Sequence, residues 1–129
     1  MKLTHQRKNL VKEWSTMKFN EYQEKAYELA QYPQSGANII YPALGLAGET
    51  GEAVDKIKKI WRNQGVSNGK IYTSEQTVEL AKELGDVLWY LAAICSELDI
   101  ELDDVALLNI EKLTSRRERG VIKSEGDNR

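Results

Sequence analysis

Apolar residues recur every three or four positions along most of the chain, and the strict alternation typical of β-strands is nearly absent. This spacing predicts an all-α fold. We expect four helices, at residues 21–32, 43–61, 74–98 and 102–119, and a shorter one around residues 10–17. The expected architecture is a four- to five-helix bundle-like fold.

Capping signals mark several of the helix ends. Asn20 with Gln23 three residues later matches a capping box for the first of the four helices, and Thr73 with Gln76 matches one for the third. Gly120 predicts the C-terminal stop of the last helix, since glycine readily adopts the left-handed conformation found there.

The third expected helix is apolar on nearly every face from residue 84 to residue 95. A helix of this kind is buried on several sides, and in so small a protein this favours cover by a neighbouring subunit. The last helix is expected to turn four apolar residues inward: Val105, Ala106, Leu108 and Leu113.

With 129 residues and 14.7 kDa, the chain is expected to form one domain, residues 1–129. Residues 1–18 are expected to be an N-terminal extension and residues 120–129 a polar tail. Eighteen Lys and Arg against twenty Asp and Glu give a net charge of −2, so nothing points to a nucleic-acid partner.

Cysteine usage and hydropathy point to a cytoplasmic location. Cys95 is the one cysteine, which favours a reducing compartment. The longest apolar stretch, residues 87–95, is nine residues long, against about 20 for a membrane helix. Charged residues interrupt the first seventeen positions, so no signal-peptide core and no membrane association are expected.

Two of the expected helices each carry a pair of acids at i and i+3: Glu49 with Glu52, and Glu83 with Asp86. Residues at this spacing share one helix face, where like charges repel each other unless a cation lies between them. The only histidine, His5, lies near the terminus, which excludes sites built on histidine. Oxygen-only ligands suit Mg²⁺ or Mn²⁺, the usual partners of phosphate chemistry.

Acid pairs on helices are also common without a ligand, and most are solvated surface, so both interpretations stay open on the residues alone. Glycines beside the acids favour a site. Gly45, Gly48 and Gly51 each cost roughly 1 kcal/mol relative to alanine within a helix, and close approach of another helix or a ligand is the expected compensation. The charged segment at residues 55–59 is expected to face solvent, with the exception of Ile57.

A polar stripe on the last helix supports a phosphate ligand. Asn109, Lys112 and Arg116 fall at i, i+3 and i+7. Lysine and arginine bind phosphate oxygens as a point charge and as a fork, respectively. For Arg116 the alternative is a simple interaction of a cation with the helix dipole near the C-terminus.

Three segments together form a specific pattern: Gly48-Glu49-Thr50-Gly51-Glu52, then Glu83-Leu84-Gly85-Asp86-Val87-Leu88-Trp89-Tyr90, and later Asn109-Ile110-Glu111-Lys112-Leu113. With this pattern the chain resembles the MazG-like members of the all-α nucleoside triphosphate pyrophosphohydrolase superfamily, in a small single-module form. The resemblance runs from residue 20 to the tail.

The resemblance implies a helical homodimer or homotetramer with metal sites near subunit interfaces. It implies hydrolysis of nucleoside or deoxynucleoside triphosphates to the monophosphate and pyrophosphate with Mg²⁺ or Mn²⁺, for nucleotide-pool control or housecleaning. The metal-binding and catalytic residues would be Glu49, Glu52, Glu83 and Asp86, and the substrate-binding residues Tyr90, Asn109 and Lys112. Arg116 on the phosphates and Trp61 under the base are further candidates from residue type. A carboxylate that the metal leaves partly unoccupied, with Glu52 as the candidate, would orient the attacking water.

Two other functions remain open from the sequence. In the first, the acids only decorate the surface of a non-enzymatic helical interaction module. In the second, the chain is another metal-dependent phosphohydrolase, acting on phosphomonoesters or a cyclic nucleotide.

Overall fold

A computed structural model describes residues 16–64 and 73–120. These residues form four helices and no strand, as predicted: α2 (Phe19–Glu28), α3 (Ile40–Gln64), α4 (Ser74–Glu97) and α5 (Leu102–Glu118). Most of the helix expected around residues 10–17 lies outside the described residues, as does most of the polar tail. None of the helices in the described ranges has the length and apolar run that crossing a bilayer requires.

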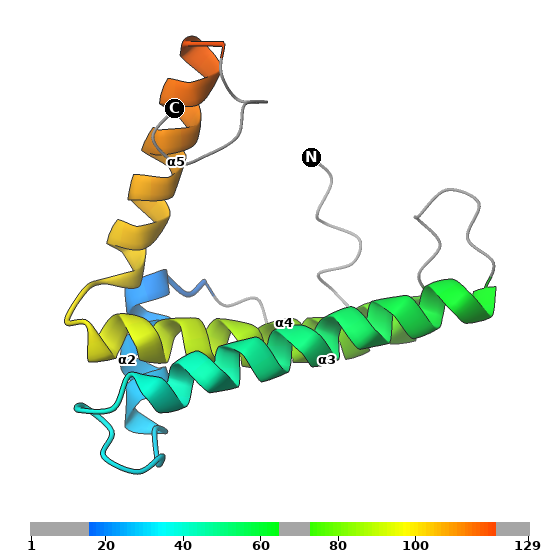
Figure 1. Ribbon diagram of the computed structural model, residues 1–129, viewed down its shortest axis with the longest axis horizontal. Helices are drawn as coiled ribbons and strands as arrows, with labels where there is room; N and C mark the ends of the chain where they lie inside the picture. Colours follow the sequence, from blue (N-terminus) through cyan, green and yellow to red (C-terminus); the bar gives the residue numbers. More distant parts are fainter. Residues whose placement is uncertain (1–15, 65–72, 121–129) are drawn as a thin grey trace.

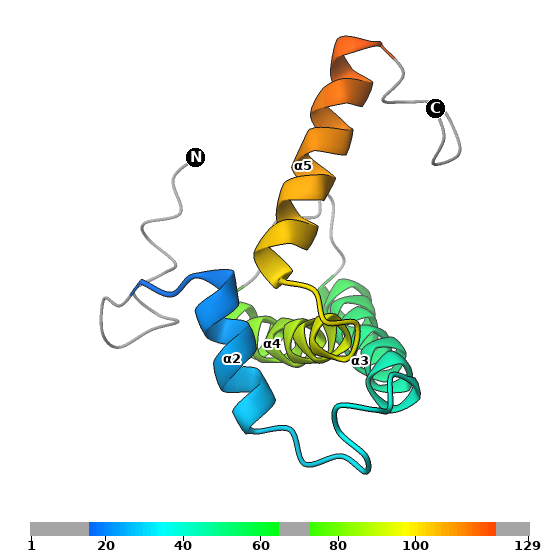
Figure 2. The ribbon, with the colours of Figure 1, turned by 90° about the vertical axis from the view of Figure 1, so that its left-hand side faces the viewer.

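The two long helices, α3 and α4, lie side by side and run antiparallel (Figure 1). Helix α2 packs on α4 near the end of this pair, and α5 contacts α2 and then leads away from the pair (Figure 2). The expected bundle is therefore not closed within the described part of one chain, because its last helix leaves the body of the molecule.

Helix α2 starts earlier than expected and uses a different cap. Lys18 is the N-cap, and its backbone N–H donates to the Glu21 carboxylate at 3.0 Å. The capping box predicted at Asn20 and Gln23 is wrong, because both side chains lie within the helix and bond elsewhere. The helix also ends at Glu28, four residues before the predicted end.

Asn20 and Gln23 instead satisfy the start of α5. The Gln23 side-chain oxygen accepts from the Leu102 N–H at 2.7 Å, and the Asn20 oxygen accepts from the Asp103 N–H at 3.1 Å. Gln23 also donates to the Ile100 carbonyl at 2.9 Å. The first N–H groups of a helix have no partner inside it. The N-cap residue of α5 makes no side-chain hydrogen bond, and the side chains of α2 accept from these N–H groups instead.

The segment between α2 and α3 is held by the carboxylate of Glu97, at the end of α4. The Tyr32 hydroxyl donates to Glu97 at 2.6 Å, and the backbone N–H groups of Gly36 and Asn38 donate at 2.8 and 2.9 Å. Tyr32 is buried and stacks on Tyr41, with ring centroids 5.1 Å apart. This burial explains why the chain leaves the helix before residue 32.

The other helix ends follow the sequence more closely. The capping box of Thr73 and Gln76 is confirmed by N–H···O bonds of 3.0 and 3.2 Å. Gly120 has φ +69°, as its place after α5 predicts. Helix α3 starts at Ile40, three residues before the prediction, so that Pro42 lies in its first turn. A proline is tolerated there because the N–H that it lacks would have no partner inside the helix.

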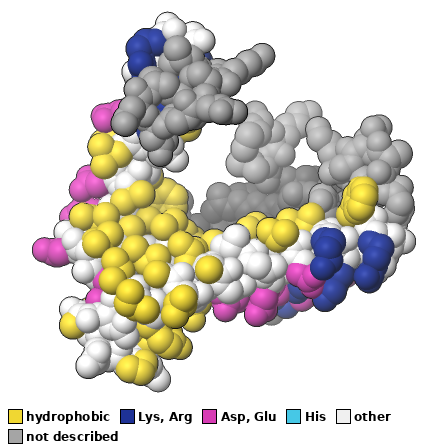
Figure 3. Space-filling model, in the orientation of Figure 1, with side chains coloured by type: hydrophobic (Ala, Val, Ile, Leu, Met, Phe, Trp, Pro, Cys, Tyr) yellow, Lys and Arg dark blue, Asp and Glu magenta, His cyan; other side chains and the backbone are white. Residues whose placement is uncertain are grey.

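The buried core is small and joins α2, α4 and the first turn of α5. Its buried residues are Ala26, Ala92, Cys95 and Leu102, with Tyr22, Leu88, Trp89, Leu91 and Val105 packed against them. Leu108 and Leu113, expected to point inward, are 65% and 40% exposed because α5 has left the core. Apolar side chains also gather on the surface at the α2 end of the molecule (Figure 3).

At Gly45 a side chain of α4 lies directly against the backbone of α3. A Cβ at this position would overlap three ring atoms of Tyr90, whereas one at Gly48 or Gly51 would meet nothing within 4 Å. Close helix packing therefore explains the first of the three glycines, and the other two border open space.

Substitution of Gly45 by alanine is expected to destabilise the fold. The overlap with Tyr90 should cost about 1–3 kcal/mol, which exceeds the gain in helix propensity of about 1 kcal/mol. Gly51→Ala receives the same gain without the overlap, so its free energy of unfolding should rise. Urea denaturation followed by circular dichroism measures both; a Gly45→Ala protein as stable as Gly51→Ala would refute the packing role.

Glu97 is expected to give the fold an acid-sensitive contact. The hydrogen bond from Tyr32, with those from the Gly36 and Asn38 backbone, holds the pKa of Glu97 below its ordinary value of 4.5. This group therefore stabilises the fold above pH 4.5 and loses that effect as the pH falls through its lowered pKa. Denaturation at pH 3 to 7 should show a smaller acid-induced loss in Glu97→Gln than in the wild type, while Glu111→Gln, on the exposed face of α5, should follow the wild type.

Candidate metal centre

Three carboxylates from two helices converge between α3 and α4. Glu49 comes from α3, and Glu83 and Asp86 come from α4. One carboxylate oxygen from each lies within 4.8 Å of the other two. Two oxygens bound to one Mg²⁺ at about 2.1 Å are at most roughly 4.2 Å apart, so small side-chain adjustments allow all three to bind one ion.

The register of the two antiparallel helices explains the convergence. Gly45 contacts Tyr90, and eleven residues further along α3 Lys56 pairs with Glu79, which lies eleven residues earlier on α4. In the same register, the position one turn after Gly45 faces the position one turn before Tyr90. Those two positions hold Glu49 and Asp86.

Repulsion among these acids is visible at Glu49. Partial desolvation, followed by the negative charges of Glu52, Asp86 and Glu83, raises the pKa of Glu49 above its ordinary value. Like charges at this separation are stable only where a cation or a proton compensates them. The donor set is oxygen-only, and a hard divalent cation such as Mg²⁺ or Mn²⁺ fits it.

Glu52 contributes charge to the centre without joining the three-carboxylate group. It is exposed and lines a neighbouring hollow of about 580 Å³. The hollow is bordered by both glycines that face open space, and by residues of both signs: Gly48, Gly51, Glu52, Asp55, Lys56, Lys59 and Glu83. A mixed lining of this kind suits a ligand that carries both cations and anions.

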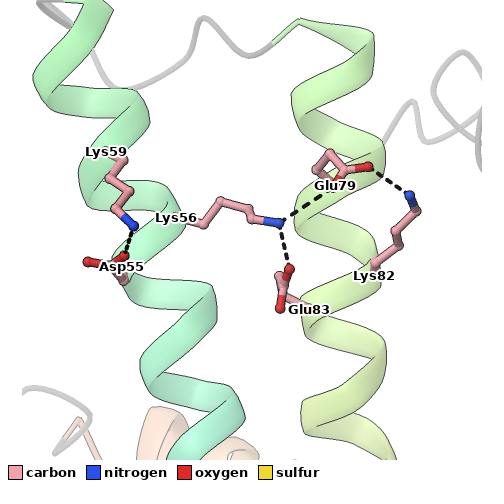
Figure 4. A network of polar contacts seen from close by, with 6 residues as sticks. All are labelled: Asp55, Lys56, Lys59, Glu79, Lys82 and Glu83. Atoms are coloured by element: carbon pink, nitrogen blue, oxygen red, sulfur yellow. Dashed lines mark hydrogen bonds and ion pairs between the residues drawn. The ribbon is translucent and has the colours of Figure 1, made fainter.

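Lys56 is the residue of this centre that sequence reasoning missed. Its Nζ lies 2.5 Å from Oε1 of Glu83 and 3.5 Å from Oε2 of Glu79, across the helix pair (Figure 4). The expectation that residues 55–59 face solvent is therefore wrong for Lys56, whose side chain is only 32% exposed. The four-residue spacing from Glu52 was the available signal, since it places Lys56 on the same face as an acid.

The lysines next to Lys56 pair within their own helix. Lys59 lies 2.5 Å from Asp55, and Lys58 bonds the same carboxylate. Hydrogen bonds from Lys58 and then Lys59 lower the pKa of Asp55 to about 2. Asp55 is thus compensated locally, whereas Glu83 depends on a lysine from the other helix.

Tyr90 lies one turn from Asp86, as its position predicts. Its ring is half-buried against Gly45 and packs edge-on to Trp89 with centroids 5.0 Å apart. Burial, followed by the neighbouring Tyr41 and Glu49, raises the pKa of Tyr90. The structure therefore places Tyr90 beside the acids and also gives it a packing role.

The other expected substrate residues lie apart from the acids. Trp61 is 63% exposed, twelve residues after Glu49 and so about 18 Å further along α3. Asn109 and Lys112 are exposed on α5, and Arg116 is buried near its end. Since α5 leads away from the α3–α4 pair (Figures 1 and 2), the described chain does not bring these three to the carboxylates.

These features define an all-α protein with a carboxylate centre between two antiparallel helices. Residues 42–121, more than half of the chain, match the MazG nucleotide pyrophosphohydrolase domain, and the chain belongs to that family. It is 42% identical over 113 residues to the "Gene 37 protein" of Mycobacterium phage L5, an alignment that covers 84% of this chain and 96% of that relative. No solved structure matches it. The membership inferred from the motifs is confirmed.

Replacement of Glu49 by glutamine should stabilise the metal-free protein, because it removes a carboxylate whose charged form is disfavoured by its neighbours. We expect a higher melting temperature than wild type in buffer with a chelator at neutral pH. Addition of Mg²⁺ should raise the melting temperature of the wild type and not that of Glu49→Gln, because a ligand stabilises only the state that binds it. A metal-free Glu49→Gln protein less stable than wild type would contradict the repulsion.

Proposed function

We propose that the chain is a metal-dependent nucleoside triphosphate pyrophosphohydrolase. It converts nucleoside or deoxynucleoside triphosphates to the monophosphate and pyrophosphate, in nucleotide-pool control or housecleaning. The observation that carries the proposal is the convergence of Glu49, Glu83 and Asp86 from two helices. Family membership supports the same reaction.

In this proposal Glu49, Glu83 and Asp86 hold Mg²⁺, with Mn²⁺ as a substitute. The bound ion would supply a Lewis acid for the phosphate oxygens and lower the pKa of a water molecule. Glu52 is exposed at the border of the hollow and does not belong to the three-carboxylate group. In the proposed reaction it orients the attacking water as a general base. Tyr90 lies one turn after Asp86, where its ring contacts Gly45 of α3.

We assign the substrate phosphates to Asn109, Lys112 and Arg116 on α5. Because this helix leads away from the acids of its own chain, the assignment requires a homo-oligomer in which α5 of one copy approaches the centre of another. Apolar residues support such contacts: Leu107, Leu108 and Ile110 on α5 are 57%, 65% and 62% exposed. Trp61 is assigned to the base in the same assembly. A homodimer and a homotetramer both satisfy these requirements.

The reaction is tested with a panel of natural and modified nucleoside and deoxynucleoside triphosphates, with Mg²⁺ or Mn²⁺. We expect one or a few to yield the monophosphate and pyrophosphate. Asp86→Asn should lower the rate by at least about 100-fold, because it removes one ligand of the ion that stabilises transferred charge. Chromatography separates the products, and pyrophosphate is scored apart from phosphate.

Asp104→Asn, in the first turn of α5, is the matched control and should retain wild-type activity. Release of phosphate alone would instead identify another kind of metal-dependent phosphohydrolase. No turnover with either metal ion would favour a helical interaction module. Sedimentation of the same preparation distinguishes a dimer from a tetramer.

A further inference from the structure

Lys56 forms an ion pair with Glu83, one of the three carboxylates that would bind a metal ion. Its ammonium bonds Oε1 of Glu83 at 2.5 Å, and the Glu83 side chain is only 17% exposed. The second partner of Lys56, Glu79, lies further away at 3.5 Å and also bonds Lys82 at 2.7 Å (Figure 4). Glu83 is therefore the main anion for Lys56, and the two cations, ammonium and metal, compete for it.

We infer that Lys56 is a displaceable counter-ion that couples the binding of metal to the binding of triphosphate. In the metal-free protein it neutralises Glu83. When a divalent cation takes Glu83, the ammonium is released into the neighbouring hollow and binds the phosphate tail of the nucleotide. This inference rests on the proposed function and adds the order of events at the same centre.

Charge and space both favour this exchange. A divalent cation attracts a carboxylate twice as strongly as an ammonium at the same distance, which favours the ion in the competition for Glu83. Glu79 shares its charge with Lys82 and cannot fully compensate the released ammonium. The hollow that Lys56 lines has open space at Gly48 and Gly51. Of its three acids, Asp55 is already paired with lysines of its own helix and Glu83 would hold the metal ion, so Glu52 alone would remain near the released ammonium. A polyphosphate that enters there would meet a cation that has lost its main partner.

The proposed coupling predicts that substitution of Lys56 changes the affinity for metal and the affinity for triphosphate in opposite directions. Lys56→Gln removes the competitor, so metal alone should bind roughly tenfold more tightly. It also removes the cation for the phosphate tail, so the metal–triphosphate complex should bind roughly tenfold more weakly. A lysine with a purely structural role would not change these two affinities in opposite directions.

The experiment compares wild type, Lys56→Gln and Lys58→Gln. Lys58 is the matched control, because it lies on the same helix, carries the same charge and pairs with Asp55 of that helix. Calorimetry measures Mn²⁺ binding without nucleotide, and then binding of a triphosphate with a non-hydrolysable α,β bridge at saturating Mn²⁺. Lys58→Gln should match the wild type in both, and Lys56→Arg, which keeps the charge, should restore wild-type values.

Equal Mn²⁺ affinity in Lys56→Gln and Lys58→Gln would overturn the inference while leaving turnover, and thus the proposed function, intact. Tighter Mn²⁺ binding without weaker triphosphate binding would overturn the transfer of Lys56 to the phosphates. Absence of hydrolysis in the wild type would refute the proposed function alone, since both binding measurements are independent of turnover. Circular dichroism checks folding, and Lys56→Met is a second neutral variant.

Discussion

The contact between Gly45 and Tyr90 fixes the register of α3 against α4, and the candidate metal centre depends on that register. Glycine at this position lets the tyrosine ring lie directly on the backbone of the opposite helix. One turn after Gly45 on α3 and one turn before Tyr90 on α4, the same register brings Glu49 and Asp86 together. A slip of one residue would rotate each acid by about 100° on its helix and separate the carboxylates.

Holding these acids together has a cost that the helix pair has to offset. The raised pKa of Glu49 reflects repulsion that no cation in the described residues fully compensates. Lys56 offsets part of it by crossing to Glu83, and the carboxylate in turn raises the pKa of Lys56, so the ammonium stays charged. Lys56 is therefore the cation that α3 supplies to these acids, and the proposed exchange with a metal ion rests on this contact.

The fold class, the central parts of all four described helices and the acidic positions were predictable, because each rests on local spacing. The i, i+3 acids and the capping box at Thr73 depend only on residues within one turn. The capping box predicted at Asn20 and Gln23 was wrong because these side chains accept from the first N–H groups of α5, a helix that starts some eighty residues later. Lys56 was missed for the same reason: its spacing from Glu52 places it on the same face as an acid, but its partners Glu83 and Glu79 lie on another helix.

The direction of α5 is the feature that local spacing could not give, and the proposed role of α5 in phosphate binding depends on it. Its apolar residues predict burial, yet Leu108 and Ile110 remain exposed after the chain folds. The first turn of α5 is bound firmly by Asn20 and Gln23, so the helix is anchored at one end and directed outward from there. The proposed assembly accounts for both stripes on this outward helix: its exposed apolar side chains would contact a second copy, and its polar side chains would reach the substrate phosphates there. Glu49, Glu83 and Asp86 define the candidate metal centre within one chain, and the phosphate contacts proposed for α5 require a second copy.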